Sequence, residues 1–269
     1  MTRCGLLAAL CASSALPGSS EAAAPSAANE RGPVRIACVG DSITYGLHAS
    51  GSNFSYPARL QGLLGQGARV GNFGHSGAAL LPVLGDPSKA RYRDTREFNA
   101  SLASRPDVVV IMLGTNDALK ASWPEQRQDF APAYAELIGT YRGLQPQPQI
   151  LIAVPPPLYK EGVWGGMMQS VINTEYPALI PRIAEANGLP PPIPVFEAFR
   201  SHCPDLQRDD CDWISGAGLF DRDPSKHGDG CHPNDVGYLH IARTVAASLA
   251  ALPRAGAPAA AADRGSRRR

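Results

Sequence analysis

The feature that most constrains the fold of this chain is a series of short apolar segments that alternate with segments of helical spacing. The clearest is Asp107–Leu113 (DVVVIML), which is apolar without interruption after its first residue and β-branched from Val108 to Ile111. Unbroken runs of this kind are typical of strands buried on both faces of a parallel sheet. We predict strands at residues 34–39, 69–72, 107–113, 149–154 and 193–196, and helices at residues 57–64, 95–104, 130–144, 171–187 and 234–252.

This alternation predicts one α/β domain. Strands that alternate with helices favour a three-layer α/β/α sandwich with the parallel sheet in the middle. Neither a linker nor an internal repeat interrupts residues 33–253, so we assign that range to a single domain. Residues 201–228 are the least regular part, rich in Asp, Gly and Cys, and we expect them to form a surface excursion before the last helix.

The two ends of the chain differ from this domain in composition. Arg3, the apolar run Cys4–Leu16 and the small residues that follow have the organisation of a secretory signal peptide, which we assign to residues 1–28. The alternative is an Ala/Ser-rich leader with no targeting role. The apolar run is too short to predict a membrane span, so we expect a secreted or extracytoplasmic protein without stable membrane insertion. Residues 254–269 are expected to be a disordered basic tail.

The formal net charge of +1 excludes a strong global field that would attract nucleic acid or an anionic membrane surface. We therefore expect no nucleic-acid partner. We also expect a monomer.

The cysteines outside the leader are Cys38, Cys203, Cys211 and Cys231. Their spacing matches no zinc-site pattern, and export favours disulfides. The polar segment between Cys203 and Cys211 has too little apolar surface to order by packing. We expect a Cys203–Cys211 bridge, with Cys38 and Cys231 either paired or buried as thiols. The second choice is a Cys211–Cys231 bridge.

Ser42 is a candidate nucleophile. A serine hydrolase needs an accessible hydroxyl, a base to take its proton, a carboxylate to orient that base, and donors for the oxyanion. Ser42 follows a predicted strand and Gly40-Asp41, which places it at the carboxyl edge of the sheet. The alternative is that Ser42 is a helix N-cap and Asp41 a turn residue.

A second candidate pair lies in the segment Asp229–Pro233. Asp229 and His232 are three residues apart on one expected turn. Such a turn can direct the carboxylate to one imidazole nitrogen while the other nitrogen faces a serine. The alternative is that Asp229 closes a turn and His232 lies on the surface near a helix start.

Two further segments can supply oxyanion donors. Asn116 lies in Leu113–Asp117, directly after the clearest strand, where its amide could donate to an oxyanion. Asn72–Gly77 is rich in glycine, which could bring a backbone N–H close to a substrate. The alternatives are that Asn116 only turns the chain and that residues 72–77 form a flexible loop.

These segments, taken together and in this order, resemble the conserved blocks of the SGNH (GDSL-type) hydrolase superfamily. The resemblance covers nearly all of residues 33–253 and implies a flavodoxin-like α/β sandwich with a five-stranded parallel sheet, in agreement with the five predicted strands. Two positions depart from the pattern: Ile43 stands where many members have Leu, and Cys231 where members often have an apolar residue. The matching blocks are Gly40-Asp41-Ser42, Asn72–Gly77, Gly114–Asp117 and Asp229–Pro233.

The resemblance also implies a role for each block residue. Ser42 would be the nucleophile, His232 the base and Asp229 the partner of the histidine. The oxyanion donors would be the backbone N–H groups of Ser42 and Gly77 and the side chain of Asn116. The implied reaction passes through an acyl-enzyme and needs no metal and no organic cofactor.

The substrate implied by the resemblance is an ester of a small molecule or carbohydrate. The segments Cys38–Gly46, Asn72–Gly74 and Ser76–Ala78 are most similar to compact secreted members that remove acetyl groups from carbohydrates. The alternatives are an esterase or thioesterase for short-chain lipids, and a catalytically silent carbohydrate-binding protein on the same fold. No long apolar lid segment is visible, which weakens a lipase interpretation.

Four aromatic residues near these segments need an assignment. We expect His75, His227 and His240 to be bystanders. Trp164 lies in a Gly-flanked loop after the fourth predicted strand, where it could stack on a sugar or simply pack.

Overall fold

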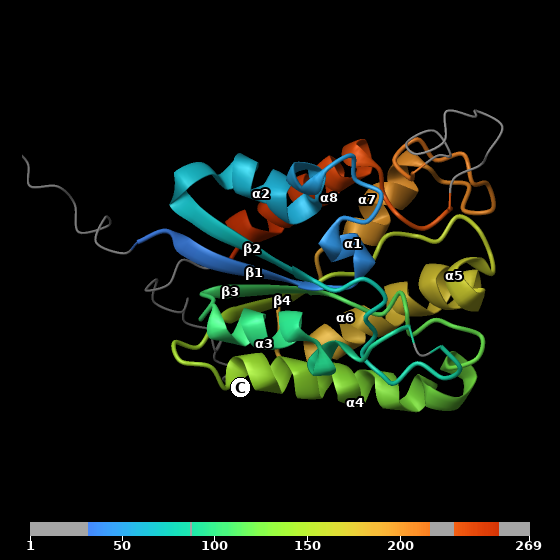
Figure 1. Cartoon of the computed structure of the whole chain (residues 1–269), viewed down its shortest axis with the longest axis horizontal. Helices are drawn as coiled ribbons and strands as arrows, with labels where there is room; N and C mark the ends of the chain where they lie inside the picture. The colour runs from blue at the N-terminus through green and yellow to red at the C-terminus, as the bar shows by residue number, and fades with distance from the viewer. Residues whose placement is uncertain (1–31, 87, 216–228, 253–269) are drawn as a thin grey trace, which may run out of the picture. The chain divides into compact units, whose positions relative to one another are not determined.

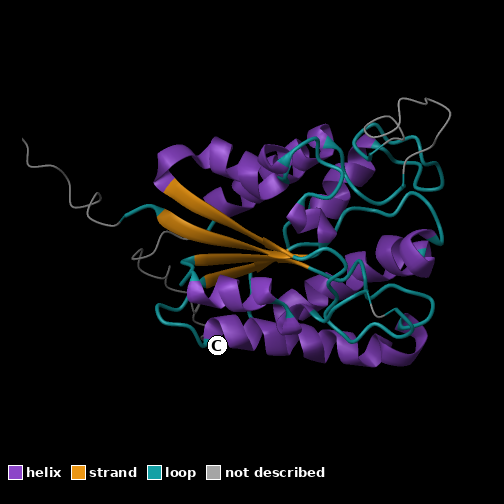
Figure 2. Cartoon of the chain, viewed as in Figure 1, coloured by secondary structure: helices purple, strands orange, loops and turns teal. Residues whose placement is uncertain are grey.

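The structure is a computed structural model, and it describes residues 32–86, 88–215 and 229–252 (Figure 2). The predicted signal peptide, the predicted basic tail, His227 and the second half of the predicted excursion lie outside these residues.

Four parallel strands form the centre of the fold (Figure 1). Their order in the sheet is β2-β1-β3-β4, so the chain starts in the middle and builds outward in both directions. Each strand falls on a predicted segment. Their bounds are Val34–Gly40 for β1, Ala68–Gly74 for β2, Val108–Met112 for β3 and Gln149–Ile152 for β4.

The predicted fifth strand at residues 193–196 is wrong as a strand. Only Ile193 pairs with the sheet, in a parallel bridge to Ala153 beside β4, and a helix begins at Val195. The reason is the proline content of this segment. Pro192 and Pro194 flank Ile193 and have no N–H to donate, so among these three residues only Ile193 donates to the sheet, to the Ile152 carbonyl at 2.8 Å.

Helices cover both faces of the sheet, which confirms the predicted α/β/α layering (Figure 1). One layer contains α2 (Tyr56–Leu64), α7 (Val195–His202) and α8 (Asp235–Ala250), and the other contains α3 (Arg96–Ala103), α4 (Trp123–Arg142) and α6 (Tyr176–Ala186). The short elements are α1 (Ser42–Tyr45), α5 (Val163–Gly166), a π-helix at Ser170–Glu175 and 3-10 turns at Ser52–Phe54, Gly65–Gly67 and Tyr92–Asp94.

Two of the predicted helices differ from the structure by more than a residue or two. Helix α4 begins at Trp123 instead of Phe130, because Pro124 occupies the first turn, where its missing N–H costs nothing. The helix predicted over residues 171–187 is divided into the π-helix and α6, with Pro177 in the first turn of α6.

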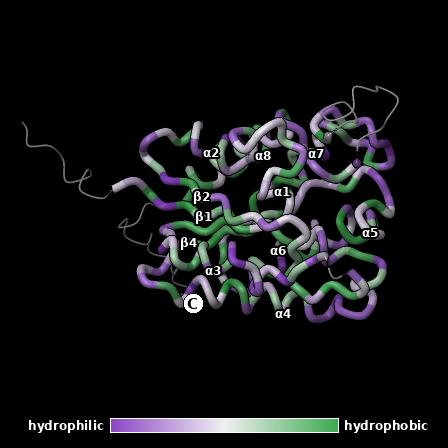
Figure 3. Tube along the Cα trace, in the orientation of Figure 1, coloured by the Kyte–Doolittle hydropathy of each residue, from purple (hydrophilic) through white to green (hydrophobic). Residues whose placement is uncertain are grey.

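The sheet separates two hydrophobic cores. Ala37 and Val39 of β1 pack toward α3, α4 and α6, whereas Ile36 and Cys38 pack toward α2, α7 and α8. This alternation has the period of two expected for a strand, and both sets are apolar because both faces are covered. Figure 3 shows the resulting hydrophobic character of the central strands. The carboxyl ends of the strands are therefore rigid platforms for the loops that follow.

The cysteines follow the leading prediction. Cys203 and Cys211 form a disulfide, while Cys38 and Cys231 are buried thiols. The second choice, a Cys211–Cys231 bridge, is wrong. Among the helices of the described residues, none combines the length and the apolarity needed to cross a membrane.

Candidate active site

The turn between β1 and α1 presents Ser42. Asp41, rather than Ser42, is the N-cap of α1, because its Oδ1 accepts the Ile43 N–H at 2.9 Å. Gly40 makes the close turn possible, since a Cβ there would lie 2.1 Å from Thr44 Oγ1 and 2.5 Å from the Met112 carbonyl oxygen. The Ser42 hydroxyl is therefore not needed to cap the helix.

The structure brings Ser42, His232 and Asp229 into one hydrogen-bonded series. Ser42 Oγ lies 2.8 Å from His232 Nε2, and His232 Nδ1 lies 2.5 Å from Asp229 Oδ2. The imidazole is 2% exposed, so water cannot compete freely for either nitrogen. In this order the carboxylate can fix the tautomer of the imidazole, which then has a free lone pair directed at the serine hydroxyl.

The turn at residues 229–232 builds the Asp–His pair locally. Asp229 Oδ1 accepts the backbone N–H groups of Cys231 at 2.9 Å and His232 at 2.8 Å, while Oδ2 accepts from the imidazole. Burial alone would raise the pKa of Asp229, but these hydrogen bonds and the proximity of His232 hold it below its usual value. The carboxyl group is therefore ionised throughout the neutral range.

The residues that carry the predicted oxyanion donors line one cavity together with His232. Ser42, Gly77, Asn116 and His232 all line a cavity of about 340 Å³. In the described part of the chain, the N–H groups of Ser42 and Gly77 donate to no other protein group. Asn116 Nδ2 donates to the Ala78 carbonyl at 3.0 Å, which leaves its second N–H for another acceptor.

Asp117, next to Asn116, fixes the loop that carries Gly77. Its carboxylate is buried and accepts the backbone N–H groups of Leu80 and Leu81, at 3.0 and 2.9 Å from Oδ1. Burial raises the pKa of Asp117 to about 7, although these hydrogen bonds act in the opposite direction. The Asn-Asp pair after β3 therefore holds the neighbouring loop from two sides.

Trp164 and His48 also contact Asp229. The Trp164 indole N–H donates to Asp229 Oδ2 at 3.2 Å, and its ring meets His232 edge-on at 5.2 Å between centroids. His48 Nδ1 lies 2.8 Å from Ser215 Oγ and 3.4 Å from Asp229 Oδ2. From its glycine-flanked loop, Trp164 was expected to stack on a sugar or to pack, but its contact with Asp229 was not predicted. His48 was missed, because nothing in its own segment marks it.

Two of the histidines expected to be bystanders, His75 and His240, have partners other than Ser42, His232 and Asp229. His75 pairs with Glu97, with 2.8 Å between Nδ1 and Oε2, and His240 stacks on Trp213 at 3.7 Å between centroids. His227 is outside the described residues.

Two groups of described side chains could offer three ligand atoms to a metal ion. In the group of His48, Asp229 and His232, the last two are already hydrogen-bonded to each other, and His232 is also hydrogen-bonded to Ser42. In the group of His202, Cys203 and Asp212, the Cys203 sulfur is part of the disulfide. Each group thus has a set of contacts that competes with metal binding.

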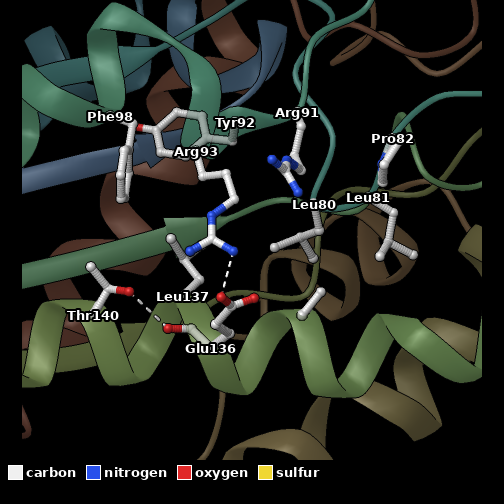
Figure 4. Close-up of a pocket in the computed structure, with 11 residues that line it drawn as sticks. Leu80, Leu81, Pro82, Arg91, Tyr92, Arg93, Phe98, Glu136, Leu137 and Thr140 are labelled. Carbon is white, nitrogen blue, oxygen red and sulfur yellow. Dashed lines mark hydrogen bonds and ion pairs between the residues drawn. The ribbon is translucent and has the colours of Figure 1, made fainter.

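A second cavity, drawn in Figure 4, lies between the loop at residues 80–82 and α4. The ion pair between Arg93 and Glu136 stands in it (Figure 4). None of the predicted site residues lines this cavity, whereas Ser42, Gly77, Asn116 and His232 line the other one.

Comparison with known proteins identifies a family and a set of similar folds. The GDSL-like Lipase/Acylhydrolase family matches residues 38–239. An acetylxylan esterase of Xylanibacter ruminicola is 31% identical over 233 residues, which are 80% of this chain and 43% of that protein. The chain thus spans less than half the length of this relative.

Solved structures of similar fold include two carbohydrate esterases. Est24, a carbohydrate acetylesterase from Sinorhizobium meliloti, matches with a TM-score of 0.57 and 21% identity over 81% of this chain and 98% of its own. Axe2, an acetylxylan esterase from Geobacillus stearothermophilus, matches with a TM-score of 0.55 and 23% identity over 80% of this chain and 93% of its own. At these identities the likeness shows the fold.

Proposed function

The chain belongs to the GDSL-like lipase/acylhydrolase family, and we propose that it is a serine esterase that removes short acyl groups, acetyl above all, from carbohydrates. The observation that carries the proposal is the hydrogen-bonded series from Ser42 through His232 to Asp229, with the first two lining an open cavity. This is the arrangement that nucleophilic acyl transfer requires.

In the proposed mechanism, His232 Nε2 takes the proton of Ser42 Oγ as the oxygen attacks the ester carbonyl. Asp229 stabilises the imidazolium that forms, and its lowered pKa keeps it ionised for that task. The imidazolium then returns the proton to the leaving alcohol. Water enters by the reverse route and releases the acid from the acyl-enzyme, so protons and charges balance within the triad.

The negative charge that develops on the carbonyl oxygen needs donors in place before the reaction. Ser42, Gly77 and Asn116 line the cavity, and the N–H groups of Ser42 and Gly77 and the second N–H of Asn116 are not used by other described groups. Preorganised donors of this kind contribute a large share of the rate acceleration in acyl transfer.

Carbohydrate acetyl esters are the substrates that the site and the relatives support best. The relative of 31% identity is an acetylxylan esterase. The cavity is open, and Trp164 borders it with 44% of its surface exposed, which suits the face of a sugar ring. A lipid chain would require a long apolar channel, whereas Asp86, Ser88 and Lys89 line this cavity.

We also propose that the protein is exported through a signal peptide at residues 1–28. The Cys203–Cys211 disulfide supports this, because such bonds persist in oxidising compartments.

The test of the proposed function combines labelling with a substrate panel. A fluorophosphonate probe should modify the wild-type protein at Ser42, and the protein should release acetate from acetylated xylo-oligosaccharides faster than it cleaves matched long-chain acyl esters. Ser42→Ala should lose labelling and at least three orders of magnitude in kcat, since the triad acts as a unit. Retention of a tenth of the activity in this variant would refute the nucleophile, and a preference for long acyl chains would refute the substrate class.

A further inference from the structure

Lys89 contacts the amide that we assign to the oxyanion. Lys89 Nζ donates to Asn116 Oδ1 at 2.7 Å, and both residues line the cavity around Ser42. The lysine is partly buried, so this charged hydrogen bond is shielded from competition by bulk water.

The two contacts of Asn116 fix which end of its amide is the oxygen and which is the nitrogen. An ammonium group can only donate, so it must meet the oxygen of the amide, and a backbone carbonyl can only accept, so it must meet the nitrogen. Lys89 and the Ala78 carbonyl satisfy these requirements from two sides. These contacts orient the second N–H of Asn116. The positive charge of Lys89 beside Oδ1 draws electron density from the amide nitrogen, which strengthens that N–H as a donor.

The backbone holds Lys89 in place independently of its side chain. Ala79 forms a parallel bridge with Arg91, with hydrogen bonds from the Ala79 N–H to the Ala90 carbonyl at 2.9 Å and from the Tyr92 N–H to the Ala79 carbonyl at 2.7 Å. This bridge places Lys89 against the loop that carries Gly77.

The side chain of Lys89 also lies beside Gly77. A Cβ at Gly77 would lie 3.6 Å from Lys89 Cγ. The stem of the lysine therefore borders one assigned oxyanion donor while its ammonium group holds another.

We propose that Lys89 is a positioning residue that orients and polarises the Asn116 amide for the oxyanion. The inference rests on the proposed function, and it assigns Lys89 no contact with the substrate. It predicts that Lys89 acts on kcat, and that it acts through Asn116.

A double-mutant cycle tests this pathway. Lys89→Met, which keeps the length and removes the charge, should lower kcat about tenfold, a fraction of the hundredfold or more that one oxyanion donor is worth, with KM changed less than about twofold. Lys89→Arg should recover most of the loss. In an Asn116→Ala background, Lys89→Met should cost less than about twofold, because the amide on which it acts is gone. Lys120→Met, at an exposed lysine, is the matched control and should leave kcat unchanged.

Several results would overturn the inference. An unchanged kcat in Lys89→Met, an effect confined to KM, or a full additional loss in the Asn116→Ala background would each exclude action through the amide. Thermal denaturation of every variant separates these effects from misfolding.

A readout that needs no turnover separates this inference from the proposed function. The side-chain NH₂ resonances of Asn116 in ¹⁵N-labelled protein should show slower hydrogen exchange in wild type than in Lys89→Met. If wild type cleaves no ester, the proposed function fails while this comparison still decides whether Lys89 holds the amide. Equal exchange in the two proteins would refute the positioning role.

Discussion

At the scale of single residues, the site depends on carboxylates held by backbone N–H groups. Asp229 accepts two such donors from its own turn, and Asp117 accepts two from the loop at residues 80–81. The pKa of Asp229 lies below its usual value, so its favourable contacts stabilise the fold above the unfolded pKa and are lost as pH falls through the folded one. The same ionised state is the one that the proposed mechanism uses.

Asn116→Ala tests the assigned oxyanion amide. It should lower kcat by about a hundredfold or more, since one such donor is worth roughly 3 kcal/mol in the transition state. Steady-state kinetics on an acetyl ester would measure it. A change confined to KM would mean that Asn116 only binds the substrate.

Trp164 offers a way to separate stacking from hydrogen bonding. Trp164→Phe removes the N–H that reaches Asp229 but keeps an aromatic face, so it should lower kcat several-fold with little change in KM on a sugar ester. Trp164→Ala should also raise KM, because the face is lost. Comparing a sugar acetate with a small aryl acetate is the control. An equal KM effect on both would contradict sugar stacking.

The sequence allowed us to predict that the residues of the four blocks lie near one another, because each follows the carboxyl end of a parallel strand or lies in a short turn. Ser42 and Asn116 follow β1 and β3, which pair directly, so their proximity follows from the sheet order. Lys89 and His48 could not be predicted in the same way. Each lies on a loop whose path is set by distant contacts, such as the bridge at Ala79 and the hydrogen bond to Ser215.

At the scale of elements, the start of α1 combines a cap with a buried charge. Asp41 caps the helix from a position that is 1% exposed. Burial raises its pKa to about 6, so the folded protein binds this proton more tightly than the unfolded chain does. The stability that Asp41 contributes is therefore present in full below the unfolded pKa and is lost as pH rises through about 6.

Asp41→Asn should remove this pH dependence while it keeps an oxygen for the Ile43 N–H. The stability of the variant relative to wild type should increase between pH 4 and pH 7, by no more than about 3 kcal/mol for a shift of about two pKa units. Urea denaturation at several pH values would measure it. A stability difference that does not vary with pH would show that Asp41 stays ionised in the folded protein.

The element that sequence patterns misassigned shows a limit of hydrophobic periodicity. The run from Ile193 to Phe196 is apolar enough for a strand, but the prolines around it remove the donors that a ladder needs. The chain can place Ile193 beside β4 and then turns into α7. Apolar pattern therefore predicted the place of the segment in the fold, and hydrogen-bonding capacity decided its form.

At the scale of the whole described domain, the segment from Asp229 through α8 ties the site together. Tyr238 donates to the Leu47 carbonyl at 2.6 Å, and Asp235 accepts from both the N–H and the hydroxyl of Ser50. These contacts fasten the start of α8 to the loop that follows α1. The distance from Ser42 to His232 is thus set by the docking of a helix, and not only by the two side chains.

Removal of the disulfide should test the stability of the segment before this turn. Cys203→Ala/Cys211→Ala should lower the free energy of unfolding by about 2–3 kcal/mol in the chain-entropy model. Activity below the melting temperature should remain close to wild type, because Cys231 takes no part in the bridge. A reductant should lower the Tm of wild type and not that of the double variant. Equal shifts in both would place the effect elsewhere.

The span between Ser42 and His232 has a consequence for the newly made polypeptide. The two residues are 190 positions apart, and His232 precedes the helix whose docking sets their distance. During synthesis from the amino terminus, the serine emerges from the ribosome long before its partner exists. In the proposed mechanism, a nascent or truncated chain without His232 carries an unreactive Ser42 hydroxyl. Esterase activity therefore arises late, together with completion of the fold.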